Sequence, residues 1–215
     1  GAVVLKRLSD AVRDGNHIYA VIKGSAVLQD GASASLTAPN GLAQQDLLRS
    51  ALKDADIAPS KVSYIEAHGT GTKLGDPIET EALASVYGSD RTEMNPLHIS
   101  SIKANIGHLE AAAGMAGLLS AIQVLNRKQA PPNARLHTMN PSITSTVEGM
   151  HMVFPTETKS LAEGRLIAGV SSFGYSGTIA HVILEEAPDQ CKNNTSLVAK
   201  PINNHSITID TCEIA

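Results

Sequence analysis

Hydrophobic residues recur through the first 188 residues at the spacings of short strands separated by helices. Apolar runs that are rich in β-branched residues and bounded by Gly, Pro or polar residues predict strands. These runs cover residues 2–5, 18–27, 62–66, 98–101, 150–154, 166–171 and 181–184. Strands that alternate with helical segments predict an α/β fold, in which helices are layered against a sheet.

Two amphipathic helices are predicted in the first half of the chain. Residues 44–52 carry apolar side chains at positions i, i+1, i+4 and i+5, which places them on one face of a helix. A second helix is expected to start with Asp76 as its N-cap, Pro77 at the first helical position and Glu79 in the first turn. It should continue to about Tyr87.

A third helix is predicted from near His108 to about Asn126. It is apolar nearly all round and rich in Gly and Ala, so we expect it to be buried on several sides. Two prolines, Pro131 and Pro132, follow it. Residues 1–188 are therefore predicted to form the folded domain, whereas the polar, aperiodic residues 189–215 are predicted to be a linker or tail.

Composition narrows the class of protein. The chain has 215 residues, of which 42% are hydrophobic, 18% charged and 3% aromatic, and its net charge of −4 gives no basic surface for nucleic acid. Its two cysteines, Cys191 and Cys212, form neither a disulfide framework nor a zinc pattern. The longest apolar segment, residues 111–125, is interrupted and too short to span a bilayer. Without a recognisable signal peptide, a cytoplasmic protein is expected.

Two short segments carry the candidate chemistry. Residues 66–72 read Glu-Ala-His-Gly-Thr-Gly-Thr, and residues 103–108 read Lys-Ala-Asn-Ile-Gly-His. They bring His68, Lys103 and His108 to the ends of predicted strands, where side chains from different parts of a chain converge. Two imidazoles and an ammonium group can polarise a carbonyl and stabilise a developing enolate.

Each of these residues also has a purely structural interpretation. Gly69 could provide the positive φ of a tight turn, His108 could cap a helix, and Lys103 could lie at the surface. A metal site formed by His68, Asp76 and His108 is a further alternative, although the glycine-rich surroundings favour a thioester pocket. The convergence of the three residues is the reason to prefer a functional site.

The motifs together resemble one enzyme family. Residues 66–72, 75–77, 103–108, 110–114 and 169–178 are similar to the C-terminal half of a β-ketoacyl synthase (ketosynthase) domain, of the type I polyketide synthase kind. The resemblance covers residues 1–188, and residues 1–15 resemble the last strand and helix of the first half. It implies a thiolase-like fold, with a mixed sheet and helices forming one half of an αβαβα sandwich, and a homodimer when complete.

The resemblance also implies a reaction. Ketosynthases join an acyl thioester to a malonyl-type extender by decarboxylative Claisen condensation. The substrates are carried on the phosphopantetheine of acyl carrier protein, and no cofactor or metal is bound directly. His68 and His108 match the histidines that hold the malonyl carbonyl and stabilise the enolate, and Lys103 matches the lysine that supports them.

Further residues match by position in the motifs. Thr70 and Thr72 match residues that hydrogen-bond the pantetheine arm. Tyr175, after Gly174, matches the aromatic gate of the acyl pocket, whose backbone N–H contributes to an oxyanion hole. Asp76 is expected to anchor the loop. Three glycines are expected to shape the site, namely Gly69, Gly71 and Gly107.

Two departures from the family pattern matter. The segment with the nucleophilic cysteine does not occur in this sequence, and neither cysteine present has an activating environment. Catalysis is therefore expected to depend on an N-terminal ketosynthase portion. Ile179 also stands where the family usually has Asn, which could loosen the adjacent glycine loop. A non-catalytic module that docks carrier protein or another synthase is the alternative, and a decarboxylase using only the two histidines is a weaker one.

Overall fold

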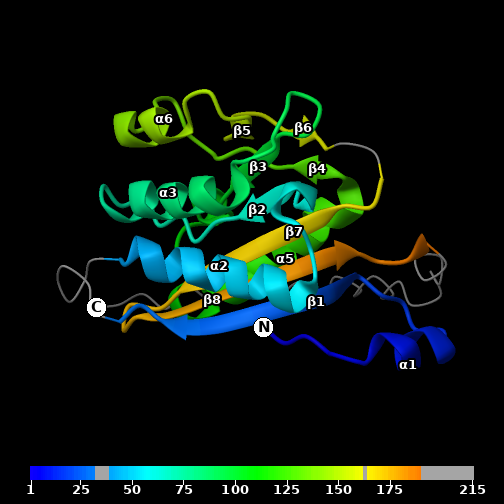
Figure 1. Ribbon diagram of the computed structural model, residues 1–215. Helices are drawn as coiled ribbons and strands as arrows, with labels where there is room; N and C mark the ends of the chain where they lie inside the picture. The colour runs from blue at the N-terminus through cyan, green and yellow to red at the C-terminus, as the bar shows by residue number, and fades with distance from the viewer. Residues whose placement is uncertain (32–38, 162–163, 190–215) are drawn as a thin grey trace, which may run out of the picture.

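The computed structural model describes residues 1–31, 39–161 and 164–189 (Figure 1). A six-stranded sheet forms its centre, in the order β1-β8-β7-β2-β3-β5, and a two-stranded sheet pairs β4 with β6. The strands are β1 (Ala20–Gln29), β2 (Tyr64–Glu66), β3 (Leu97–Ser100), β4 (Gln129–Ala130), β5 (Met152–Val153), β6 (Lys159–Ser160), β7 (Ile167–Phe173) and β8 (Thr178–Glu186).

The large sheet is mixed, as predicted. Strands β7, β2, β3 and β5 are parallel neighbours, whereas β8 is antiparallel to both β7 and β1. Only β8 therefore runs against the other strands of this sheet. Because parallel strands end at the same edge, the segments that follow β2, β3 and β7 meet at one edge of the sheet.

Helices cover both faces of the sheet. In Figure 1, α2 and α3 lie on the near face and α5 lies behind the strands. The helices are α1 (Leu8–Arg13), α2 (Gly41–Ala55), α3 (Gly75–Tyr87), α4 (Lys103–Ile106), α5 (Ala113–Arg127) and α6 (Pro141–Val147), with 3₁₀ turns at Pro59–Lys61 and Glu110–Ala112. The short helices α4 and α6 and the strands β4 and β6 were not predicted from the sequence.

Two hydrophobic cores lie on opposite sides of the sheet. Consecutive residues of a strand point to opposite faces, so Ile65 of β2 joins the core under α2 and α3, whereas Tyr64 joins the core under α5. Both side chains are fully buried. The end of β2 is therefore fixed from both sides, and it is there that the His68 loop begins.

The predicted helical stripe of residues 44–52 is confirmed within α2. Leu47, Leu48, Ala51 and Leu52 are all buried, as one face of an amphipathic helix should be. Asn40 caps the helix, since its side-chain oxygen accepts hydrogen bonds from the backbone N–H groups of residues 42 and 43 at 3.1 and 3.2 Å.

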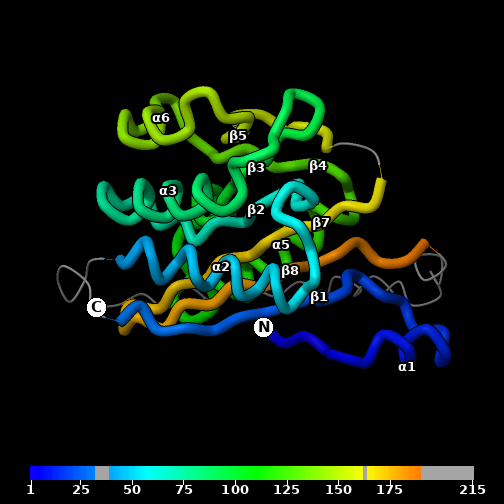
Figure 2. The backbone as a smooth tube through the Cα atoms, in the orientation of Figure 1, coloured from blue at the N-terminus to red at the C-terminus, as the bar shows by residue number. Residues whose placement is uncertain are grey.

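Three sequence-based predictions were wrong in detail. Residues 2–5 form no strand; Val4 is 97% exposed and Leu5 71%, and apolar pattern alone makes no strand without a neighbour to pair with (Figure 2). The helix predicted to start with Asp76 as N-cap begins at Gly75, with Leu74 as N-cap. Asp76 instead lies within the first turn.

The third helix begins later than predicted, at Ala113. Gly107 and Glu110 adopt positive φ angles of 81° and 49°, which a continuous right-handed helix does not allow. Within this chain α5 buries one face against the sheet, and Leu119 on another face is 47% exposed. The expected burial on several sides is therefore not seen in the described residues.

Among the described residues, no helix is long and apolar enough to cross a membrane. The predicted tail and both cysteines fall within residues 190–215, outside the part of the chain that the structure describes.

Candidate functional site

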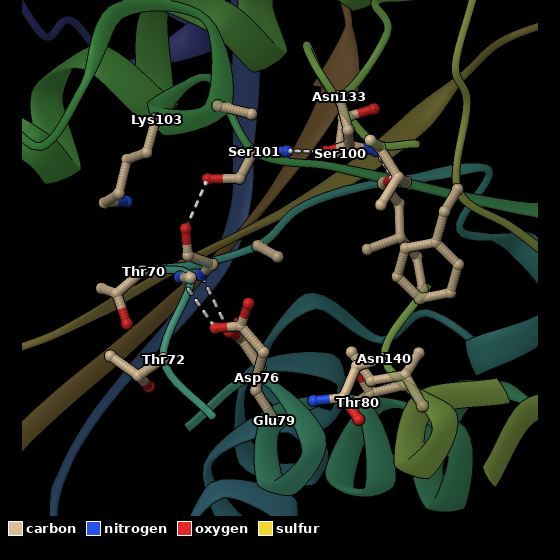
Figure 3. A pocket seen from close by; sticks show the side chains of 18 of the residues that line it. Thr70, Thr72, Asp76, Glu79, Thr80, Ser100, Ser101, Lys103, Asn133 and Asn140 are labelled. Atoms are coloured by element: carbon tan, nitrogen blue, oxygen red, sulfur yellow. Dashed lines mark hydrogen bonds between the residues drawn. The ribbon is translucent and has the colours of Figure 1, made fainter. Parts of the chain in front are cut away.

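The loop after β2 is held by two carboxylates of α3 (Figure 3). Glu79 accepts hydrogen bonds from the backbone N–H groups of His68 at 2.7 Å and Gly69 at 2.9 Å. Asp76 Oδ1 accepts one from the N–H of Gly71 at 3.1 Å. Thr72 Oγ1 accepts one from the N–H of Gly75, the first residue of α3, at 3.0 Å. The loop is thus fastened to the first turns of α3 along its whole length.

Gly69 is required by both conformation and space. Its φ of 44° is uncommon for other residues, and a Cβ at this position would lie 2.7 Å from the Cβ of Ser101. Ser101 Oγ also donates a hydrogen bond to the Gly69 carbonyl at 3.4 Å. The glycine therefore lets the His68 loop approach the segment that follows β3.

The second segment leaves β3 and carries Lys103 and His108. Its backbone is held at Ser101 N, which donates to Asn133 Oδ1 at 3.0 Å, and at Ile102 N, which donates to Glu66 Oε1 at 2.6 Å. Lys103 begins α4, and Gly107 ends it with a φ of 81°. This turn brings His108 back to the His68 loop.

The structure brings the two predicted histidines together. The ring centroids of His68 and His108 are 6.1 Å apart, with the rings nearly perpendicular at 88°. Phe173, at the end of β7, packs its ring 5.0 Å from that of His68. Segments after three different strands thus meet around His68.

Backbone hydrogen bonds fix the tautomers of both rings. His68 Nδ1 accepts from the N–H of Phe173 at 3.3 Å, and His108 Nδ1 accepts from the N–H of Glu110 at 2.8 Å. A nitrogen that accepts a hydrogen bond carries no proton, so the proton of each neutral ring lies on Nε2. Both imidazoles are therefore set to donate a hydrogen bond through Nε2.

The electrostatic environment keeps His68 neutral. Burial, with help from the charges of Lys103 and His108, lowers the pKa of His68 to about 4. Burial also lowers the pKa of Lys103, and the negative charges of Glu66, Glu79 and Asp76 oppose that change. Near neutral pH the site combines a neutral imidazole with a cation, which favours an anion between them.

A pocket of about 560 Å³ lies between the two segments. Thr70, Thr72, Lys103 and His108 line it, and Figure 3 shows Lys103 reaching toward the loop that carries the threonines. Predicted site residues Gly69, Gly71, Asp76 and Gly107 also line the pocket. His68 lies beside it.

The remaining predicted residues lie elsewhere. Tyr175 is 85% exposed, and neither it nor Gly174 lines the pocket; both belong to the turn between β7 and β8. The Gly174 N–H closes that turn by donating to the Thr178 carbonyl at 2.7 Å. Ile179 is buried, at 1% exposure, and faces Phe173 across the β7–β8 pair.

Sequence reasoning gave no site role to Glu79 or Glu66. Glu79 was interpreted as a helix-start residue, yet it is buried, and burial raises its pKa to about 7. Helical spacing held the information, because Glu79 and the buried Leu83 are four residues apart on one face of α3. Glu66 was part of the quoted motif, but no pattern showed that its side chain is buried.

The described residues contain no group of three or more His, Cys, Asp or Glu side chains that could hold a metal ion. The groups that do converge are two Nε2–H donors, a lysine and two threonine hydroxyls. Such a set can hold an oxyanion and a polar substrate arm.

Comparison with known proteins agrees with this arrangement. Residues 19–137 match the family model described as "Beta-ketoacyl synthase, C-terminal domain". Over 192 residues, 88% of this chain, it is 50% identical to part of the phenolphthiocerol/phthiocerol polyketide synthase of Mycobacterium tuberculosis. Over 197 residues, 91% of this chain, it is 51% identical to polyketide synthase GfsE of Streptomyces halstedii. The chain spans 10% and 5% of the length of these two relatives.

Solved ketosynthases share its fold. The ketosynthase from module 6 of the bacillaene synthase of Bacillus subtilis 168 superposes with a TM-score of 0.77 at 40% identity, over 85% of this chain and 33% of that one. The oxazolomycin ketosynthase domain OzmH KS7 of Streptomyces albus JA3453 gives 0.79 at 34% identity, with the same coverage. The chain therefore belongs to the β-ketoacyl synthase family, as a C-terminal part of a ketosynthase with the thiolase-like fold, of the type I polyketide synthase kind.

Proposed function

We propose that this chain supplies the enolate-stabilising side of a ketosynthase active site. The reaction is the decarboxylative Claisen condensation of an acyl thioester with a malonyl-type extender, both carried on acyl carrier protein. The observation that carries the proposal is the pair of imidazoles, His68 and His108, whose Nδ1 atoms are both occupied by backbone N–H groups. Their Nε2–H groups are the donors for the thioester oxygen of the extender.

The proposed chemistry needs these donors to be neutral. When the malonyl group loses carbon dioxide, the electron pair of the broken C–C bond moves into an enolate, and negative charge collects on the thioester oxygen. A neutral imidazole stabilises that charge without readily protonating the enolate carbon. The low pKa of His68, about 4, fits this role.

Lys103 and the two threonines complete the proposed site. The positive charge of Lys103 favours the enolate oxyanion, and its position in the pocket with Thr70 and Thr72 fits a polar pantetheine arm lying along the loop. Tyr175 is proposed to face the acyl pocket when the nucleophilic cysteine is supplied from an N-terminal ketosynthase portion. We likewise propose the homodimer of complete ketosynthases and a cytoplasmic location.

The test uses the native polypeptide that contains this sequence, called here the parent polypeptide. Supplied with acyl and malonyl carrier proteins, it should form a β-ketoacyl product and carbon dioxide. His68→Ala and His108→Ala should each lower the rate of decarboxylation by about 10²-fold or more, the cost of removing one oxyanion donor. Exposed His137→Ala is the matched control. A parent polypeptide that binds carrier protein but releases no carbon dioxide would instead support the docking module.

A further inference from the structure

Glu66 is a buried carboxylate with three hydrogen-bond donors. Its side chain is 1% exposed at the end of β2, two residues before His68. Oε2 accepts from the hydroxyls of Tyr64 at 2.7 Å and Ser120 at 2.9 Å, and Oε1 accepts from the backbone N–H of Ile102 at 2.6 Å. The one side chain thus connects β2, α5 and the start of the Lys103 segment.

The donors select an ionised carboxylate. A carboxylate only accepts hydrogen bonds, whereas a protonated carboxyl or an amide would turn one hydrogen toward a neighbouring donor. Burial raises the pKa of Glu66, while the N–H of Ile102, the two hydroxyls and the charge of Lys103 act in the opposite direction. A buried charge that is fully hydrogen-bonded is costly to replace by one that is not.

The surrounding backbone is shaped to admit this carboxylate. Gly117 of α5 faces it, and a Cβ on Gly117 would lie 3.2 Å from Glu66 Cγ and 3.5 Å from a methyl group of Val170. The glycine therefore lets α5 lie close enough for Ser120, less than one turn further on, to reach Oε2.

Ile102 is the residue immediately before Lys103, so its hydrogen bond acts directly on the lysine. The segment is short, and its first residue, Ser101, is held separately by Asn133. Loss of the Ile102 bond would free the backbone at the base of the Lys103 side chain. Loss of the carboxylate would also remove a negative charge that acts on Lys103 from the sheet side.

Resting on the proposed function, we propose that Glu66 is a positioning residue for Lys103: its carboxylate fixes the backbone that carries the lysine and keeps the lysine charged in its buried site. It touches neither substrate nor reacting atoms. The charged or titratable groups that act on Lys103 or are acted on by it are Glu66 from β2, Asp76 and Glu79 from α3, and His68 from the loop.

The first experiment is Glu66→Gln in the parent polypeptide, with carbon dioxide release from malonyl carrier protein measured across pH. We expect kcat to fall by about 10- to 100-fold with little change in KM, because a small misplacement of a catalytic group costs about that much. Removing the negative charge of Glu66 lowers the pKa of Lys103. The basic limb of the rate profile should therefore move to lower pH. A merely structural defect would not move it.

Glu81→Gln is the matched control, since Glu81 is an exposed carboxylate on α3. If Glu66→Gln does not fold, the Tyr64→Phe and Ser120→Ala double variant removes both donors to Oε2 and keeps the charge and the Ile102 bond. It should lower kcat by only about 2- to 5-fold without moving the basic limb. A Glu66→Gln or double variant with wild-type kcat and an unmoved Glu66→Gln profile would overturn the proposal.

The two proposals fail in different ways. A wild-type parent polypeptide without His68-dependent decarboxylation contradicts the proposed function. An active, His68-dependent wild type whose Glu66→Gln variant keeps the wild-type rate and pH profile contradicts only the role of Glu66.

Discussion

Glu79 holds His68 by its backbone, with Oε1 of the glutamate 2.7 Å from the histidine nitrogen. The second carboxylate oxygen holds Gly69 at 2.9 Å. The position of the histidine is therefore determined by a side chain from α3, eleven residues further along the chain, and not by the loop's own conformational preference.

Replacement of Glu79 should affect both stability and rate. Glu79→Gln turns an NH₂ group toward one of the two backbone donors, so one hydrogen bond is lost inside a buried site. We expect the free energy of unfolding to fall by about 1–3 kcal/mol and kcat for decarboxylation to fall by about 10-fold or more. Urea unfolding and carbon dioxide release measure the two effects. Glu81→Gln, on the exposed side of α3, should change neither; an unchanged Glu79→Gln variant would show that the loop holds its own shape.

His181 should make stability depend on pH. It is fully buried between the hydroxyls of Tyr87 and Ser171, each 3.0 Å from a ring nitrogen, and burial lowers its pKa from 6.5 to about 3. In the unfolded chain the ring takes up a proton near pH 6.5, whereas in the folded chain it does not. Its contribution to stability is therefore complete above pH 6.5 and is lost as pH falls, by up to about 1.4 kcal/mol per pH unit.

Unfolding free energies at pH 7, 6 and 5 measure this slope. His181→Gln should be less stable at pH 7 but should lose less stability on acidification than the wild type. The exposed His137→Gln variant is the matched control. Equal slopes in the wild type and His181→Gln would mean that the buried ring is protonated in the folded protein.

Gly24 should not accept a side chain. It lies in β1 next to a register irregularity, and a Cβ there would overlap the backbone of α2, at Ala55 N and within 2.8 Å of Ala51 O. Backbone atoms cannot move aside as a flexible side chain can. Gly24→Ala is expected to destabilise the protein by about 1–3 kcal/mol or more.

Gly41→Ala is the matched control for this substitution. Its Cβ would meet Ile78 at 3.4 Å, an ordinary van der Waals distance, and it lies in the first turn of α2. It should leave the melting temperature nearly unchanged. A Gly24→Ala variant that melts with the wild type would show that β1 and α2 can separate at little cost.

The isolated chain should present apolar surface. Three large side chains on and before α5 are about half exposed: Ile106 at 52%, Leu109 at 45% and Leu119 at 47%. Polypeptide 1–189 alone should enhance the fluorescence of anilinonaphthalenesulfonate and should self-associate. Ile106→Gln, Leu109→Gln and Leu119→Gln in combination should reduce both effects. A monodisperse monomer that binds no dye would contradict the expectation of a covered face.

The sequence predicted the elements whose burial follows a simple period. The stripe of residues 44–52 became α2, and the apolar runs near residues 62–66 and 166–171 became β2 and β7. It failed where tertiary contacts decide. Residues 2–5 have a strand's pattern but do not pair, and Asp76 has a cap's sequence context but bonds the N–H of Gly71.

The site was predicted unevenly for a similar reason. His68, Lys103 and His108 stand in glycine-rich segments at strand ends, and such segments are visible in one dimension. Glu79 and Glu66 act through buried side chains that reach other segments of the chain. Which backbone group a buried carboxylate reaches depends on how α3 and α5 dock on the sheet, and periodicity does not contain that information.

The fastening of the His68 loop to α3 has a consequence for hydrogen exchange. Loops usually exchange their amide protons quickly, yet the N–H groups of His68, Gly69 and Gly71 are all bonded to carboxylates of one helix. Their exchange requires the loop to leave the helix or the helix to leave the sheet. The three amides should therefore exchange together and slowly, at rates closer to those of α3 than of a surface turn, and the catalytic loop and its helix open as one cooperative unit.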